Sequence, residues 1–223
     1  MNSEPRKMNS QIAMLQLREM IFSGRLPPGS NHLETELAAE LGMSRTPIRE
    51  AAVMLEAQGL VQLQPRHGIR VRGLSVADMR EIYDVLGNLE SLAAARAAEA
   101  GHPIERLEPL MQSITAMEQA LAAGDRLAWA RADEVFHTEL VTLSDNRHLV
   151  DAVARVNDQV RRARNVTLYL REMPESSTED HRAVANAIAA GDADAARSLH
   201  AAHRDTAREM MTRLLEQIGL QQF

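Results

Sequence analysis

Residues 36–51, ELAAELGMSRTPIREA, decide the fold of the front of the chain. Gly42 is a turn residue between two helical segments, and Pro47 suits the first position of a helix, where its missing N–H costs nothing. We therefore expect Thr46 to be the N-cap of the second helix. Apolar residues at helical spacing predict its buried stripe, which consists of Ile48, Ala51, Ala52 and Leu55.

The segments around this helix pair predict a winged helix-turn-helix. Residues 10–23 have helical periodicity and stop at Gly24, and the second helix of the pair extends to about residue 58. Behind it, residues 60–64 and 69–72 alternate apolar and polar side chains around a short turn, which is the pattern of a β-hairpin. Three helices followed by a hairpin make a domain that we place at residues 1–72.

The remaining chain predicts an antiparallel all-helical bundle over residues 73–223. Glycine, proline and Asp/Asn pairs interrupt a pattern that is otherwise helical throughout. The fold class is therefore mainly α. The six expected helices span residues 75–100, 103–123, 125–143, 146–171, 177–190 and 192–218.

Composition and charge indicate a soluble globular protein rather than a secreted or membrane protein. The 223 residues include no cysteine, which excludes disulfides and thiolate metal sites. The first eleven residues lack an apolar signal core and no apolar run reaches about 18 residues, so we expect a cytoplasmic protein with no membrane partner. Residues 1–72 carry 9 Arg and Lys against 7 Asp and Glu, whereas residues 73–223 carry 16 against 24. This asymmetry fits a DNA-facing front and an acidic rear.

The start of the second helix carries the residues that we expect to read DNA. Arg45 and Arg49 are i, i+4 neighbours opposite the apolar stripe, and arginine is the usual bidentate reader of guanine. Thr46 and the free N–H groups of the first turn suit a phosphate. Taken alone, the arginines could equally be a solvated pair on a helical hairpin. The hairpin favours DNA, because His67-Gly68 allows close approach and Arg66, Arg70 and Arg72 supply charge.

Four residues of the rear domain form a candidate site for a divalent metal ion. Asp133 and His137 share one face of a predicted helix, His181 begins a later one, and His203 lies on the apparent apolar stripe Leu199, His203, Met210 and Leu214. Three imidazoles and a carboxylate can surround one cation and leave positions open for water or an effector. The alternative is a hydrogen-bonded histidine network in the core. His32, His102, His148 and His200 lack apolar spacing, and we expect them at the surface.

The front of the chain resembles the GntR family of bacterial regulators. The resemblance implies that Arg45, Thr46, Arg49 and the wing tip at His67-Gly68 contact the operator. Ser44 belongs to the same motif and joins this set. The matching positions, from Ile21 to Val71, include Gly24, Pro28-Gly29, Leu37-Ala38, Leu41-Gly42, Ser44 to Ala51, Gly59-Leu60-Val61, Pro65 and Gly68.

The rear of the chain resembles the FCD effector domain of the FadR subfamily, in its shorter, VanR-type branch. The match covers about residues 75–215 and rests on Asp133-x-x-Phe136-His137, Asn146, residues 180–183 and the segment from Gly191 to His203. The resemblance implies a metal ion held by Asp133, His137, His181 and His203. Zinc is the first choice, with nickel or manganese as alternatives.

The sequence departs from this family at Leu86. Many members have an arginine there, one turn before the position of Glu90, which helps to hold an effector carboxylate. Another cation could substitute, and the candidates are Arg155, Arg161 and Arg162.

These features together predict a homodimeric repressor that a small organic acid releases from operator DNA. The chain is not expected to be an enzyme. Three alternatives remain: a metal sensor in which the ion is the effector, a purely structural metal, and a metal-dependent hydrolase with Glu134 or Glu139 as its base.

Overall fold

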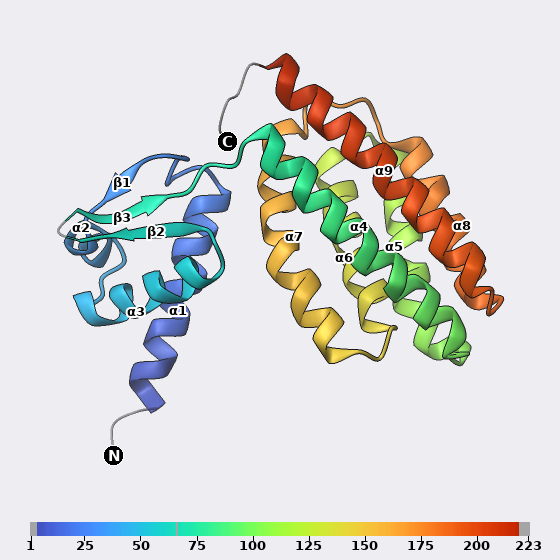
Figure 1. The fold of residues 1–223 in the computed structure, drawn as a ribbon, viewed down its shortest axis with the longest axis horizontal. Coiled ribbons are helices and arrows are strands. Elements are labelled where there is room, and N and C mark those ends of the chain that lie inside the picture. Colours follow the sequence, from blue (N-terminus) through green and yellow to red (C-terminus); the bar gives the residue numbers. More distant parts are fainter. Residues whose placement is uncertain (1–3, 66, 219–223) are drawn as a thin grey trace. The chain divides into compact units, whose positions relative to one another are not determined.

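The computed structural model describes residues 4–65 and 67–218. The chain divides into two compact units, and the division falls between Ser75 and Val76 (Figure 1). The predicted boundary, after Arg72, lies three residues earlier. None of the helices in the part of the chain that the structure describes combines the length and apolar character that a membrane crossing requires.

The N-terminal unit is a winged helix. Its three helices are α1 (Glu4–Phe22), α2 (Glu34–Glu40) and α3 (Arg45–Ala57). Its sheet has the order β1-β3-β2, with β1 at Asn31–His32, β2 at Val61–Gln64 and β3 at Gly68–Val71. The hairpin of β2 and β3 is the predicted wing, and β1 is a strand that the sequence analysis missed because it is only two residues long.

One core holds the N-terminal unit together. Helix α1 packs against α3, and the wing closes the core from the other side. The predicted stripe of α3 is correct, since Ile48, Ala51, Ala52 and Leu55 are all buried. In the hairpin, Val61 pairs with Val71 and Leu63 with Ile69, which directs their side chains to one face.

The C-terminal unit is the predicted bundle of helices. The six helices in its described part are α4 (Val76–Glu99), α5 (Ile104–Ala123), α6 (Arg126–Thr142), α7 (Arg147–Thr167), α8 (Glu175–Ala189) and α9 (Ala193–Gln217). Polar side chains start several of them: Asp125, Asn146 and Asp192 each accept hydrogen bonds from backbone N–H groups of the following turn.

Helix α4 is the central element of this bundle. It lies along α9 for most of its length, as Figure 1 shows, and it also contacts α6, α7 and α8. The inner faces of these helices are mostly Ala, Leu, Val and Met, but they also bury a group of charged and imidazole side chains. That polar group is the candidate site of this unit.

Candidate functional sites

Helix α3 begins two residues earlier than predicted. Ser44 is its N-cap and Arg45 its first residue, so the expectation that Thr46 is the N-cap is wrong. Pro47 is therefore the third helical residue. The position is still free of strain, because the first four N–H groups of a helix have no partner within it. Pro47 is buried, and its ring helps to fix the helix start against the core.

The side chains predicted to read DNA are exposed at this helix start. Ser44, Arg45, Thr46 and Arg49 all face solvent. The Arg45 side chain is 67% exposed, and its Nη2 lies 3.5 Å from Oε2 of Glu34 on α2. This contact restrains the guanidinium, but an ion pair so exposed contributes little energy and can be exchanged for another partner.

The wing lies beside the start of α3 and completes an open groove. Arg45 and Arg49 line one side of the groove, and Gln64, Pro65 and Gly68 of the hairpin line the other. His67 and Arg70 are exposed, whereas Arg66 lies outside the described residues. The structure thus brings the predicted arginines and the wing tip together on one surface.

Gly68 is required by the geometry of the wing. Its φ is +83°, and a Cβ there would lie 2.2 Å from the carbonyl oxygen of His32. That distance is far inside van der Waals contact, so no other residue fits without displacement of backbone. The tip of the wing is consequently packed directly against β1, which leads into α2.

The three histidines predicted to bind a metal meet in the interior of the C-terminal unit. His137 of α6, His181 of α8 and His203 of α9 are 1%, 0% and 5% exposed. Each offers a ring nitrogen, and the three nitrogens lie within 4.8 Å of one another. The Nε2 atoms of His137 and His181 are 3.3 Å apart, and Asp133 Oδ1 lies 3.6 Å from both.

These distances are compatible with a divalent cation. Ligand atoms about 2.0–2.2 Å from one ion are separated by roughly 3.0–3.5 Å, close to the observed triangle of two nitrogens and one oxygen. A contact of 3.6 Å is too long for a hydrogen bond. The buried Nδ1 atoms of His137 and His181 have no hydrogen-bond partner. The residues therefore fit a cation of the zinc, nickel or manganese class.

Asp133 is held in place from behind by a residue that the sequence analysis did not select. Its Oδ2 is 2.6 Å from Nη1 of Arg164 on α7, which leaves Oδ1 directed toward the histidines. Burial alone would raise the pKa of Asp133, but Arg164, His137 and His181 outweigh it and hold the pKa well below its usual range. The carboxylate is therefore negative, as a metal ligand must be.

His200 is not the surface residue that was predicted. It is completely buried, and its Nε2 lies 3.5 Å from Oε2 of Glu90 on α4. The same Glu90 oxygen is 3.6 Å from Nδ1 of His137 and forms a close ion pair with Arg204 of α9. Glu90, His137 and His200 form a second group with metal-ligand spacing, but the guanidinium of Arg204 already neutralises its only carboxylate.

The face of α9 explains the error over His200. The predicted stripe contained Leu199 and Met210, and both are largely exposed. The buried face is turned by one residue and consists of Ala196, His200, His203, Arg204, Met211, Thr212 and Leu215. Of the other histidines expected at the surface, His148 is exposed, while His32 and His102 are half-buried.

Burial keeps His137, His181 and His200 neutral. It lowers the pKa of His137, His181 and His200 well below the ordinary value, and the nearby guanidinium of Arg204 acts in the same direction. A neutral imidazole has a free lone pair for a metal ion. Burial raises the pKa of Glu90, and Arg204 opposes that rise.

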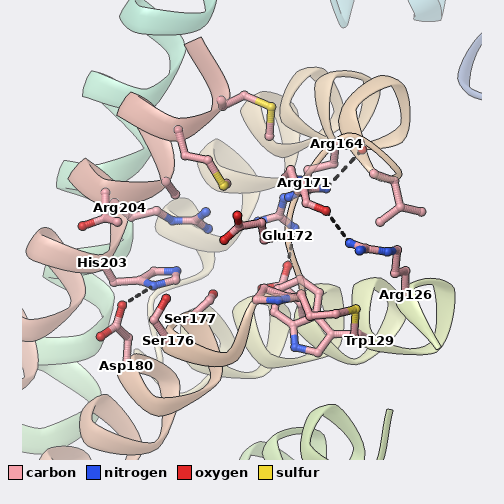
Figure 2. Close-up of a pocket in the computed structure, with 18 of the residues that line it drawn as sticks. Arg126, Trp129, Arg164, Arg171, Glu172, Ser176, Ser177, Asp180, His203 and Arg204 are labelled. Atoms are coloured by element: carbon pink, nitrogen blue, oxygen red, sulfur yellow. Dashed lines mark hydrogen bonds and ion pairs between the residues drawn. The ribbon is translucent and has the colours of Figure 1, made fainter. Parts of the chain in front are cut away.

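A cavity of about 200 Å³ opens beside the histidines. His203 and Asp133 lie on its wall, together with four arginines that come from three helices and the segment after α7. Figure 2 shows His203, Arg204 and Asp180 on one side of the cavity and Arg126 and Arg171 on the other. The four arginines are Arg126, Arg164, Arg171 and Arg204.

The three arginines selected from the sequence do not line this cavity. Arg155 is exposed, and Arg161 lies 3.7 Å from Glu134. Arg162 is buried elsewhere in the bundle, and burial lowers its pKa to about 10. Leu86, the position of the missing family arginine, is buried in α4. A guanidinium reaches this neighbourhood from α9 instead, since Arg204 pairs with Glu90, one turn after Leu86.

Two known families match the chain in the order of its two units. The bacterial regulatory proteins of the gntR family match residues 9–71, and the FCD domain matches residues 81–206. The chain is a GntR-family regulator with an FCD domain. The family match confirms the resemblance inferred from the winged-helix and histidine motifs.

Relatives of this GntR regulator extend over nearly the whole chain. The HTH-type regulator YdhC of Bacillus subtilis is 32% identical over 91% of this chain and 90% of its own. A protein of Paenarthrobacter nicotinovorans, named as the probable D-xylose utilization operon transcriptional repressor, is 31% identical over 88% of this chain and 87% of its own. The protein is thus a transcription regulator and not the hydrolase considered above.

A solved structure supports the fold of the GntR regulator as a whole. E. coli McbR/YncC superposes with a TM-score of 0.78 over 92% of this chain and 97% of that chain, at 21% identity. At this identity the likeness concerns the fold alone. It confirms the prediction of a winged helix-turn-helix followed by a helical bundle.

Proposed function

We propose that the protein is a homodimeric repressor that binds a two-fold operator through α3 and the wing. Residues 1–72 carry the DNA-binding role and residues 73–223 the dimer contact and effector site. The observation that supports DNA reading is the exposed pair Arg45 and Arg49 beside the wing tip. Such an arginine pair at a helix start reads base edges in a major groove. The repressor named in P. nicotinovorans supports repression.

The DNA role is tested with a duplex selected from a random pool by the full-length protein. Arg45→Ala and Arg49→Ala should each cost about 1–3 kcal/mol on this duplex, because each removes a base contact. Arg70→Ala should weaken the selected and random duplexes alike, as expected for a phosphate contact. Fluorescence anisotropy measures both.

The control is Arg25→Ala, which removes an exposed arginine of the same unit that pairs with Glu40 outside the groove. It should leave affinity unchanged. Selected duplexes should contain two half-sites about one helical turn apart, and the full chain should sediment as a dimer. Normal affinity in both α3 variants would refute the assignment of α3 as the reading helix.

We further propose that Asp133, His137, His181 and His203 hold a divalent metal ion and that a small organic acid binds beside it. The support is the triangle of Asp133 Oδ1 and two Nε2 atoms, together with the adjoining cavity lined by arginines. When bound, the ion supplies positive charge and open coordination positions. The protein's own contribution is to hold neutral imidazoles and a negative carboxylate facing one point.

The metal is tested by elemental mass spectrometry and by thermal unfolding with and without chelator. Zinc at 100 times its dissociation constant would stabilise the folded protein by about 2.7 kcal/mol. His181→Ala should abolish this stabilisation, whereas His148→Ala, an exposed histidine of α7, should not. Protein that takes up no metal and unfolds identically with chelator would show that the four residues are only a polar core network.

One alternative is a regulator for which the ion itself is the signal. The burial of the histidines favours it, because an ion bound there contacts three helices of the bundle interior. The two are separated by adding chelator to the DNA complex in the absence of any acid. A large change in DNA affinity identifies a metal sensor, and an unchanged affinity refutes it.

A further inference from the structure

Arg126 and Arg171 form a cationic end of the cavity, opposite the histidines. Arg126 Nη1 donates to the carbonyl oxygen of Arg171 at 2.5 Å, and Arg171 Nη2 donates to the carbonyl oxygen of Arg164 at 3.2 Å. These two bonds fix both side chains at the cavity wall. Among the described residues, no carboxylate lies within ion-pair distance of Arg126 or Arg171.

The other two arginines of the cavity are already neutralised. Arg164 is paired with Asp133, and Arg204 is paired with Glu90, which is itself completely buried. Burial also lowers the pKa of Arg171, and the neighbouring Arg164 adds to this effect. Arg126 and Arg171 therefore lack the paired carboxylate that Arg164 and Arg204 have.

The carboxylates at the histidine end of the cavity do not neutralise its other end. Asp133 pairs with Arg164, and Oδ2 of Asp180 lies 3.3 Å from Nδ1 of His203. An uncompensated charge in a partly buried site is costly, so an acid group of a ligand would be stabilised between Arg126 and Arg171. A cation at the proposed metal site would attract a second acid group to the histidine end.

We infer that the cavity binds a small dicarboxylate, with one acid group beside His203 and Arg204 and the other between Arg126 and Arg171. This deepens the proposed function and rests on it. The size of the cavity agrees, since about 200 Å³ is below the roughly 300–1,000 Å³ of pockets that take drug-sized ligands. A ligand with a single acid group would leave either the histidine end or the Arg126 end without its partner.

The inference is tested on the full-length, zinc-loaded protein after free zinc has been removed. The probes are malonate, succinate, glutarate and adipate, each compared with the monocarboxylate of the same carbon number. Trp129 is the only tryptophan and lies on the cavity wall, so its fluorescence reports occupation directly, and calorimetry gives the affinity. At least one dicarboxylate should bind about tenfold or more tightly than its partner, because a charge-assisted contact is added.

Variants locate the second acid group. Arg126→Gln and Arg171→Gln should each reduce the preference for the dicarboxylate to within about threefold, whereas Arg171→Lys should retain part of it. The matched control is Arg131→Gln, an exposed arginine of α6 outside the cavity. It should leave the preference intact. Melting temperatures confirm that each variant is folded.

The outcomes separate this inference from the proposed function. If every monocarboxylate binds as tightly as its dicarboxylate, the second acid group is refuted and an organic-acid effector still stands. If the preference is present but survives both glutamine variants, the position at Arg126 and Arg171 is refuted. If no acid of either kind binds, the inference and the acid effector fall together.

Discussion

The two units of this regulator use arginine in opposite ways. In the winged helix, Arg45 is 67% exposed and its carboxylate partner, Glu34, is 3.5 Å away across a solvated surface. In the bundle, Arg204 is 2% exposed and in close contact with a fully buried Glu90. An exposed pair costs little to open and is available to a new partner, whereas a buried pair is costly to break. Exposure thus suits recognition of DNA, and burial suits a fixed internal site.

The largest expected effect breaks the buried pair. Glu90→Leu leaves the guanidinium of Arg204 unpaired in the interior, and we expect the free energy of unfolding of the C-terminal unit to fall by about 3–5 kcal/mol. Urea titration followed by Trp129 fluorescence, with chelator present, measures this unit alone. The double variant Glu90→Leu with Arg204→Met removes both charges and should recover most of the loss. Equal losses in the single and double variants would show that the two residues do not act as a pair.

A second change tests the rigidity of the winged helix. Gly68→Ala places a side chain on a residue with left-handed backbone geometry, which costs about 1–2 kcal/mol. The new methyl group also meets the His32 carbonyl, so we expect the free energy of unfolding of this unit to fall by about 2–3 kcal/mol in total. Gly24→Ala is the control, because Gly24 has a similar φ of +77° and open space around it. Hydrogen exchange of the wing amides should accelerate much more in the first variant than in the second.

A third prediction concerns the pH dependence of stability and tests the contrast between the exposed groups of the winged helix and the buried groups of the bundle. The pKa values of His137, His181 and His200 are lowered in the folded state, so the unfolded chain takes up their protons first as pH falls below about 6.5. Stability of the metal-free C-terminal unit is therefore full above that pH and is lost below it, by up to about 1.4 kcal/mol per pH unit for each histidine.

The variant His200→Leu isolates the contribution of a single histidine to this pH dependence of stability. The slope of the unfolding free energy against pH, between about pH 6.5 and 5.5, should be smaller in this variant by up to about 1.4 kcal/mol per pH unit. That difference corresponds to one proton fewer taken up on unfolding. Asp133 stays charged in this window because its pKa is lowered. Glu90 has a raised pKa and acts with the opposite sign, but it does so in both proteins. An identical slope in the two proteins would mean that His200 is protonated in the folded state.

The smallest effect is expected at the exposed pair of Arg25 and Glu40, whose side chains are 61% and 42% exposed. Arg25→Gln should change the free energy of unfolding by less than about 1 kcal/mol, and 0.5 M salt should remove the difference. Thermal unfolding by circular dichroism measures it. A loss comparable to that of Glu90→Leu would contradict the contrast drawn between the two units.

The same contrast explains what could be predicted from the sequence. The winged helix is built from local signals: Gly42 and Pro47 mark the turn, and Ile48 to Leu55 mark the buried stripe. The cap of α3 was misplaced, because proline is tolerated at any of the first positions of a helix. Helix α1 begins at Glu4, six residues before the predicted start at residue 10, and the two-residue strand β1 was missed. All six helices of the bundle were also found, since glycine, proline and capping residues punctuate them.

The site of the bundle was only partly accessible from sequence. Asp133 and His137 are neighbours on one helix, and a family resemblance added His181 and His203. His200, Glu90 and Arg204 were missed because buried polar residues look like surface residues when the face of a helix is judged from apolar spacing alone. The cavity arginines were missed because they meet only when α6, α7 and the segment before α8 pack together.

The glycine at the wing tip has a consequence for the thermodynamics of recognition. Gly68 lies against the His32 carbonyl, and β1 pairs with β3 of the wing at Asn31–Arg70 and His32–Ile69. A surface fixed in this way loses little conformational entropy when a partner settles on it. A free loop would lose its conformational entropy when it binds, whereas here that entropy is already lost when the protein folds.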